Sequence, residues 1–116
     1  MIVNSGKIGV GLTNPLEKMQ IGDLWTFHDG GNKVIGYNYH WDSGDKRINN
    51  SLPSSGIYFD DNGGIKIKTS SNINNNNIVW LDGIIVDNEG NVGIGGSPSL
   101  NSYHKLSVNG LYVPKN

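Results

Sequence analysis

The stretch GNVGIG, residues 90–95, places two β-branched residues among glycines, and GKIGVG, residues 6–11, repeats it position for position. Each copy continues through a proline, Pro15 or Pro98, to a lysine, two apolar residues and a glycine. The second copy has three extra residues, which fall within 99–104. One repeat unit therefore bounds the chain at each end, with about 65 different residues between the two units.

The alternation inside the repeat predicts a short strand with one apolar face and one glycine face. Successive side chains of a strand point to opposite faces, so Ile8 shares a face with Val10, and Val92 with Ile94. A face without side chains lets another backbone approach closely. Three identical chains wound about one axis would stack the β-branched residues inward and press neighbours against the glycines. We therefore expect a homotrimer whose interface contains the apolar residues of both units. These residues are Ile8, Val10, Val92, Ile94, Leu106 and Val108.

Turn signals recur about every ten residues, and the segments between them alternate like strands. The turns at 29–32 and 61–64 each separate two such segments. The dipeptides at 82–83 (Asp-Gly) and 109–110 (Asn-Gly) predict two-residue hairpins, because a type I′ turn needs positive φ at both central positions. The fold expected from these signals is all-β.

The predicted architecture is an intertwined homotrimeric fibre segment with a central β-meander. Residues 1–22 form the N-terminal repeat unit, 23–87 a central β-rich subdomain that contains the aromatic residues, and 88–116 the C-terminal repeat unit. The asparagine tract at 72–77 predicts a loop tip, and 15–19 has the composition for one helical turn at most.

Composition limits the function classes. The 116 residues include 17 glycines and only 35% hydrophobic residues, so a lone chain has little core material, and self-association would compensate for this. A net charge of −1 with 16% charged residues gives no basic surface for nucleic acid. No apolar run approaches the ~20 residues of a membrane-spanning helix, so no membrane insertion is expected. Residues 1–4 lack the features of a signal peptide, so the chain carries no visible export tag of its own.

No motif predicts catalysis, a cofactor or a metal. The glycine-rich repeats resemble a phosphate-binding loop, but the lysine and the following helix of such a loop are missing. The alternating acids at 87–91 do not continue as a calcium loop, since Val92 and Pro98 occupy the positions of its glycine and its last glutamate. One alternative stays open, which is a three-nitrogen metal site made by His28 from each of three chains. No Gly-x-Ser-x-Gly elbow is present, and we predict that the protein is not an enzyme.

The aromatic residues are the candidates for ligand binding. Tyr37, Tyr39 and Trp41 alternate, as do Trp25 and Phe27, so each set is expected on one face of a strand. Exposed rings beside polar side chains suit a sugar ring, and the same rings buried would form the core of a subdomain. The candidate ligand contacts are Trp25, Tyr37, Tyr39, His40 and Trp41.

The two ends of the chain also resemble a known family. GKIGVGLTNPLEKMQIGD at 6–23, and GNVGIGGSPS with HKLSVNG at 90–110, are similar to the fibre repeats of bacteriophage tail fibres and tailspikes. Related units occur in Bacteroidetes surface and injection-system fibre proteins. The segment at 21–48 is also similar to one that follows this repeat, whereas Gly96-Ser97 departs from the usual Thr-Thr.

The resemblance implies a homotrimeric β-rich shaft or knob segment with a structural, adhesive or receptor-binding role. Its implied place is a virion tail fibre or a cell-surface fibre outside the cell. The implied partner is a cell-surface glycan or another host receptor. A carbohydrate-binding receptor tip that uses the Trp25, Tyr37, Tyr39 and Trp41 face is the alternative function.

Overall fold

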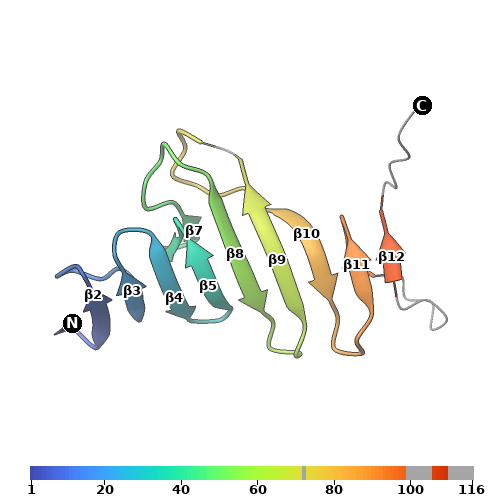
Figure 1. Cartoon of the computed structure of the whole chain (residues 1–116), viewed down its shortest axis with the longest axis horizontal. Helices are drawn as coiled ribbons and strands as arrows, with labels where there is room; N and C mark the ends of the chain where they lie inside the picture. Colours follow the sequence, from blue (N-terminus) through green and yellow to red (C-terminus); the bar gives the residue numbers. More distant parts are fainter. Residues whose placement is uncertain (72, 99–105, 110–116) are drawn as a thin grey trace.

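A computed structural model describes residues 1–71, 73–98 and 106–109. The described residues contain strands, turns and bends but no helix, which confirms the all-β prediction. Ten strands form one long twisted sheet, and β6 and β7 form a small hairpin against it (Figure 1). The strands are β1 (Ile2–Asn4), β2 (Lys7–Val10), β3 (Met19–Ile21), β4 (Trp25–Asp29), β5 (Lys33–Tyr37), β6 (His40–Trp41), β7 (Asp45–Lys46), β8 (Ser54–Phe59), β9 (Ile65–Ser70), β10 (Leu81–Val86), β11 (Val92–Ile94) and β12 (Leu106–Val108).

The strands follow one another across the sheet in chain order, with β6 and β7 left out. Neighbours are antiparallel except at the two ends, where β2 pairs with β3 and β11 pairs with β12 in parallel. The sequence repeat is thus a structural repeat, made of an antiparallel hairpin followed by a parallel strand. An equivalent bond closes each unit, from Gly22 N to Val10 O at 2.7 Å and from Asn109 N to Ile94 O at 2.8 Å.

The repeat glycines are covered by their own chain. A Cβ placed on Gly9 would lie 2.6 Å from the carbonyl oxygen of Leu12, and one on Gly93 would lie 2.2 Å from that of Gly96. In both units the loop after the strand folds back across the glycine, with Pro15 buried in the first unit. The expected alternation of faces is confirmed, but the expectation that a neighbouring chain presses on the glycines is wrong.

The turns at 29–32 and 61–64 connect β4 to β5 and β8 to β9 as predicted. The predicted hairpin at 82–83 is wrong, because β10 runs straight through this dipeptide. The extra backbone length is absorbed by a register shift between Asp82 and Ile84, a β-bulge, which is a common position for a strand glycine. The second arm of the predicted hairpin at 109–110 lies outside the described residues.

One face of the sheet carries a continuous row of apolar side chains that crosses all ten strands. The pairing register places each member of the row directly beside the next, and seven of the ten are exposed. We call this the apolar face. The row consists of Val3, Ile8, Met19, Phe27, Ile35, Ile57, Ile67, Ile84, Ile94 and Val108.

The opposite face, which we call the covered face, holds the core. Val34 and Tyr58 project from β5 and β8 and pack with Tyr39, and Ile78 and Trp80 from the segment after β9 close over them. Ring centroids of Tyr58 and Trp80 lie 5.6 Å apart with the planes nearly perpendicular, a favourable edge-to-face arrangement. The connections between β5 and β8 and between β9 and β10 therefore act as the second layer of the fold (Figure 1).

Candidate functional site

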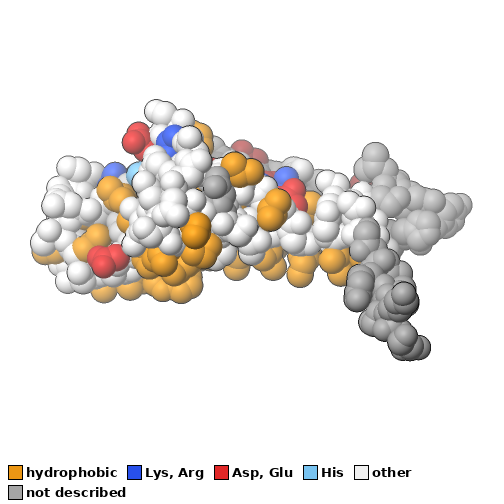
Figure 2. Space-filling view, turned by 90° about the horizontal axis from the view of Figure 1, so that it is seen from above, with side chains coloured by type: hydrophobic (Ala, Val, Ile, Leu, Met, Phe, Trp, Pro, Cys, Tyr) orange, Lys and Arg blue, Asp and Glu red, His pale blue; other side chains and the backbone are white. Residues whose placement is uncertain are grey.

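The predicted interface residues all lie on the apolar face. Ile8, Ile94 and Val108 belong to the ten-residue row, and the others belong to the rows beside it. Figure 2, a view along the strands, shows hydrophobic side chains gathered along one edge over much of the length of the molecule. One flanking row contains Val10, Ile21, Trp25, Tyr37, Ser55, Thr69 and Leu81. The other contains Phe59, Ile65, Val86, Val92 and Leu106, and it continues at one end through the charged residues Lys33 and Asp29.

No described segment of the chain packs over this face. The exposed members of the central row include Phe27 at 38%, Ile57 at 37% and Ile67 at 42% of their surface. Monomeric soluble proteins rarely expose an apolar surface of this extent, and such surfaces usually mark sites of association. The apolar face is therefore the first candidate functional surface.

The predicted aromatic face does not exist as one surface. Strand β5 ends at Tyr37, and Asn38 adopts a left-handed conformation with φ of +53°. This kink crosses the chain from the apolar face to the covered face, so Tyr39 points into the core and is 1% exposed. The Thr26 hydroxyl fixes the new path by donating to the carbonyl oxygen of Tyr39 at 2.7 Å.

The five candidate ligand contacts consequently separate into three environments. Trp25 and Tyr37 form a tilted ring pair on the apolar face, with centroids 5.5 Å apart. Tyr39 is core. His40 and Trp41 form the short strand β6 on the covered side, where burial lowers the pKa of the His40 imidazole.

The left-handed turn at Asn38 is stabilised by a buried amide. Its Nδ2 donates to the carbonyl oxygens of Asn49, Leu52 and Pro53 at 2.9 to 3.0 Å, and its Oδ1 accepts from the Asn49 amide at 2.7 Å. Asparagine tolerates this conformation better than most residues. The only sequence signal for this kink is the asparagine between two tyrosines. A prediction from the alternating pattern alone ignores this signal and continues the strand through Asn38.

Arg47 lies beside this turn and is buried, with 1% of its surface exposed. Its guanidinium donates to the Leu52 carbonyl oxygen at 3.0 Å and to the hydroxyls of Ser54 and Ser70 at 3.1 and 2.8 Å. Burial lowers the pKa of this guanidinium, and no carboxylate of the described residues pairs with it. Arg47 therefore tethers the β7–β8 connection to β9.

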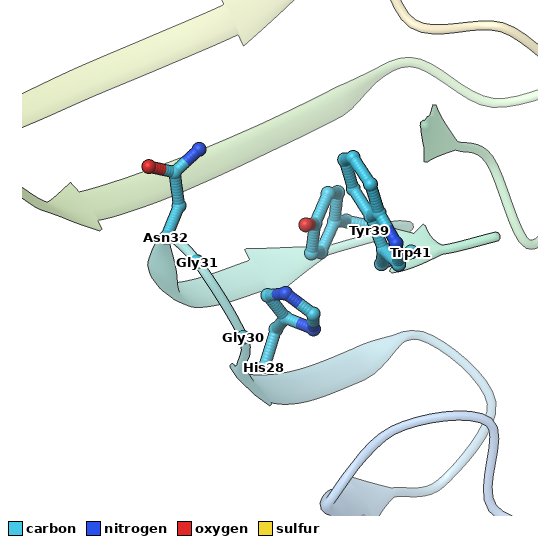
Figure 3. A pocket seen from close by; sticks show the side chains of 6 residues that line it. All are labelled: His28, Gly30, Gly31, Asn32, Tyr39 and Trp41. Carbon is cyan, nitrogen blue, oxygen red and sulfur yellow. The ribbon is translucent and has the colours of Figure 1, made fainter. Parts of the chain in front are cut away.

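A small cavity on the covered side is the second candidate site. It has a volume of about 420 Å³ and lies between the turn from β4 to β5 and the short strand β6 (Figure 3). Three rings gather on one side of it, and the turn with Asn32 lies on the other. The lining residues are His28, Gly30, Gly31, Asn32, Tyr39 and Trp41.

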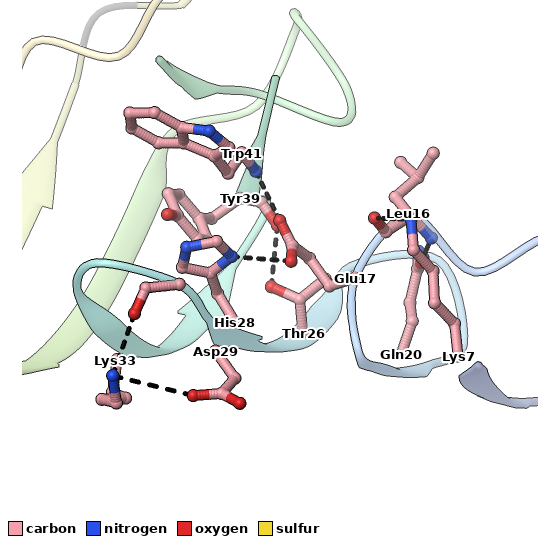
Figure 4. A network of polar contacts seen from close by, with 11 residues as sticks. Lys7, Leu16, Glu17, Gln20, Thr26, His28, Asp29, Lys33, Tyr39 and Trp41 are labelled. Atoms are coloured by element: carbon pink, nitrogen blue, oxygen red, sulfur yellow. Dashed lines mark hydrogen bonds and ion pairs between the residues drawn. The ribbon is translucent and has the colours of Figure 1, made fainter. Parts of the chain in front are cut away.

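Glu17 accepts hydrogen bonds from two residues that line this cavity, His28 and Trp41 (Figure 4). Its carboxylate accepts a hydrogen bond from His28 Nδ1 at 2.8 Å with one oxygen and from the Trp41 backbone amide with the other. Glu17 is 5% exposed, although it follows the N-terminal glycine repeat in a segment that the sequence marks only as a weak helical turn. Sequence reasoning missed this residue, because nothing local shows that a surface-type acid turns inward.

The described part of the chain contains neither a cluster suited to a metal ion nor a helix that could span a membrane. Residues 1–71, 73–98 and 106–109 contain no group of three or more histidine and acidic side chains that is suited to a metal ion. His28 lies on the covered face with one ring nitrogen held by Glu17, away from the apolar face. Across the same residues, no helix is long and apolar enough to cross a bilayer.

A scan against protein-family models and a search of curated proteins give no match to this chain.

Proposed function

We propose that the chain is a structural and adhesive segment of a homotrimeric, tail-fibre-like protein, in which three copies bury their apolar faces around a common axis. The observation that carries the proposal is the ten-residue apolar row. The ten strands of a chain already pair with one another, so the proposed contacts are made by side chains across the axis.

The dimensions of the apolar face support three copies. The row crosses the strands and follows the long dimension of a molecule that measures 50 × 34 × 23 Å. The face is only three rows wide, which spans about 14 to 20 Å along the strands. Three such strips arranged as a triangle lie about 4 to 6 Å from their common axis, close to half the ~10 Å spacing of packed sheets. Side chains of this size therefore fill the interior without a channel.

The two repeat units support a role as part of a fibre. Each end of the sheet carries the same hairpin and parallel strand, and the pairing places the units at opposite ends of the long axis. An assembly built along this axis would extend by further copies of the unit. The resemblance of both units to fibre repeats agrees with this arrangement.

The proposal assigns the covered face to the outside of the fibre. The loops of the β5–β8 and β9–β10 connections lie on that face, and they would be presented to solvent around the shaft. In this arrangement, binding of a host or surface receptor belongs to these loops and not to the rings at the axis. Trp25 and Tyr37 are accordingly interface residues in the proposal.

The oligomeric state tests the proposal directly. Size-exclusion chromatography with light scattering at micromolar concentration is expected to give three times the chain mass of 12.6 kDa. A mass of one chain would overturn the proposal. A mass of two chains would retain the apolar face as an interface but would replace the triangular arrangement by two stacked sheets.

A further inference from the structure

We propose that the cavity beside Trp41 binds a neutral sugar ring, a hexopyranoside. The cavity is built from one chain and lies on the covered side of the sheet, away from the apolar face. This inference therefore goes beyond the trimeric assembly and does not depend on it. The groups that would contact the sugar are the indole of Trp41, the imidazole of His28 and the turn that contains Gly30, Gly31 and Asn32.

The indole of Trp41 supplies a stacking surface. Trp41 is 51% exposed, so much of the indole is accessible to a ligand. The His28 imidazole lies nearly parallel to it, with centroids 6.1 Å apart and 28° between the planes. The backbone amide of Trp41 is fixed by the Glu17 carboxylate, so the ring projects from an anchored strand. The C–H face of a pyranose packs well on such a surface.

His28 supplies a hydrogen-bond acceptor with a defined direction. A carboxylate oxygen only accepts, so the Glu17 contact at 2.8 Å places the hydrogen of the neutral imidazole on Nδ1. The other ring nitrogen, Nε2, makes no hydrogen bond to any of the described residues and lies at the turn that lines the cavity. It is thus prepared to accept a hydrogen bond from a hydroxyl group, because a buried partner sets the tautomer.

The turn from β4 to β5 closes the opposite side. A Cβ on Gly30 would lie 2.4 Å from His28 Nε2, so only glycine leaves the imidazole edge free at this position. The exposed amide of Asn32 adds a donor and an acceptor, and its side chain makes no hydrogen bond within the described part of the chain. Sugar hydroxyls both donate and accept, which matches this set.

The charges around the cavity favour a neutral ligand. No aspartate, glutamate, lysine or arginine is among its lining residues. Both oxygens of Glu17 are engaged, and Lys33 Nζ is directed to the Gly30 carbonyl oxygen at 2.9 Å and to surface carboxylates. A volume of about 420 Å³ lies within the usual range for small-molecule sites and accommodates one or two sugar rings.

The test is a titration of the whole chain with methyl β-D-galactopyranoside and, separately, methyl β-D-glucopyranoside, each to about 50 mM, a range that detects millimolar dissociation constants. Two-dimensional ¹H–¹⁵N NMR spectra follow the indole of Trp41 and the amides of Gly30 and Gly31. At least one glycoside is expected to shift these signals in a saturable manner. The absence of saturable shifts with both glycosides would overturn the proposal.

Two tryptophan variants locate the site. Trp41→Ala removes the stacking surface and should weaken binding about tenfold or more. Trp25→Ala is the matched control, since Trp25 is 54% exposed but lies on the apolar face, and its affinity should equal that of the wild type. Equal binding by both variants, or a loss only in Trp25→Ala, would overturn the proposal.

A third variant keeps the test independent of the indole. Gly30→Ala places a methyl group against His28 Nε2 and should reduce binding, whereas Ser51→Ala changes an exposed residue that does not line the cavity and should not. Circular dichroism confirms that both variants fold. Unchanged affinity in Gly30→Ala would contradict the role given to Nε2. A chain that is monomeric and still binds the glycoside would refute only the trimer.

Discussion

The two faces of the long sheet arise from the same period-two alternation, yet they are stabilised in different ways. The covered face is packed by the chain's own loops, and its buried polar groups, such as Asn38 and Arg47, are bonded to backbone and hydroxyl partners. The apolar face carries more large hydrophobic residues but receives no cover from the described residues of the chain. In the proposed trimer the apolar face would form a second core, made by residues of different copies.

The contrast between the apolar face and the covered face also distinguishes two tryptophans. Trp25 and Trp41 are about equally exposed, at 54% and 51%. Trp25 lies in a row that flanks the central apolar row, whereas Trp41 lines the cavity together with His28 and Asn32. Equal exposure therefore corresponds to different proposed roles, and the neighbours of each ring decide which role applies.

The largest expected effect comes from a charge in the middle of the apolar row. Ile57→Asp should convert the trimer to monomers at micromolar concentration, because assembly would bury an unpaired carboxylate at a cost of several kcal/mol. Ile57 is 37% exposed within the chain, so the fold itself should persist. Asn62→Asp adds the same charge to an exposed turn and should remain trimeric. Sedimentation velocity checks both, and a trimeric Ile57→Asp would remove the distinction between the faces.

The next effect concerns the polar interior of the covered face. Arg47→Ala leaves a void and deprives the Ser54 and Ser70 hydroxyls of a donor, so the free energy of unfolding should fall by about 3 kcal/mol. Lys18→Ala removes the same charge from an exposed position and should change stability by less than about 0.5 kcal/mol. Urea denaturation measures both, and equal losses would mean that Arg47 is not a structural tether.

A smaller effect is expected where the repeat loop covers its glycine. Gly93→Ala brings a methyl group against the backbone at Gly96 and Pro98, and should cost about 1 to 3 kcal/mol. Gly31→Ala has nothing within 4 Å and should be neutral within about 0.5 kcal/mol. Thermal unfolding compares the two. A tolerated alanine at Gly93 would show that the loop does not pack as described.

The smallest effect is a dependence of stability on pH at β6. Burial lowers the pKa of His40 below the 6.5 of the unfolded chain, so the unfolded state binds more protons as the pH falls. The contribution of His40 is therefore present above pH 6.5 and is lost progressively below it. His40→Gln should flatten the fall in unfolding free energy between about pH 7 and pH 5. An unchanged slope would mean that His40 does not titrate differently in the two states.

The sequence predicted the features that depend on local alternation and on the repeat. The all-β class, the turns at 29–32 and 61–64, and the shared face of Ile8 and Val10 follow from period two and from turn chemistry. The hairpin at 82–83 was wrong because the dipeptide that favours a turn also suits a bulge in a continuous strand.

The cavity could not be predicted from the sequence. Glu17 and Trp41 are 24 residues apart, and their contact depends on the kink at Asn38 and on the crossover after β2. Alternation placed Tyr37, Tyr39 and Trp41 on one face, since it assumes an unbroken strand. The left-handed conformation of Asn38 instead places Tyr39 in the core on the covered face.

The most direct measurement is the reactivity of a single thiol in the apolar row. The chain has no cysteine, so Ile57→Cys and Asn62→Cys each provide one defined site for a maleimide reagent. If copies cover the apolar face, the thiol at position 57 should react roughly a hundredfold more slowly than the one at 62, because access requires opening of the interface. Comparable rates at concentrations where the mass is measured would contradict the account.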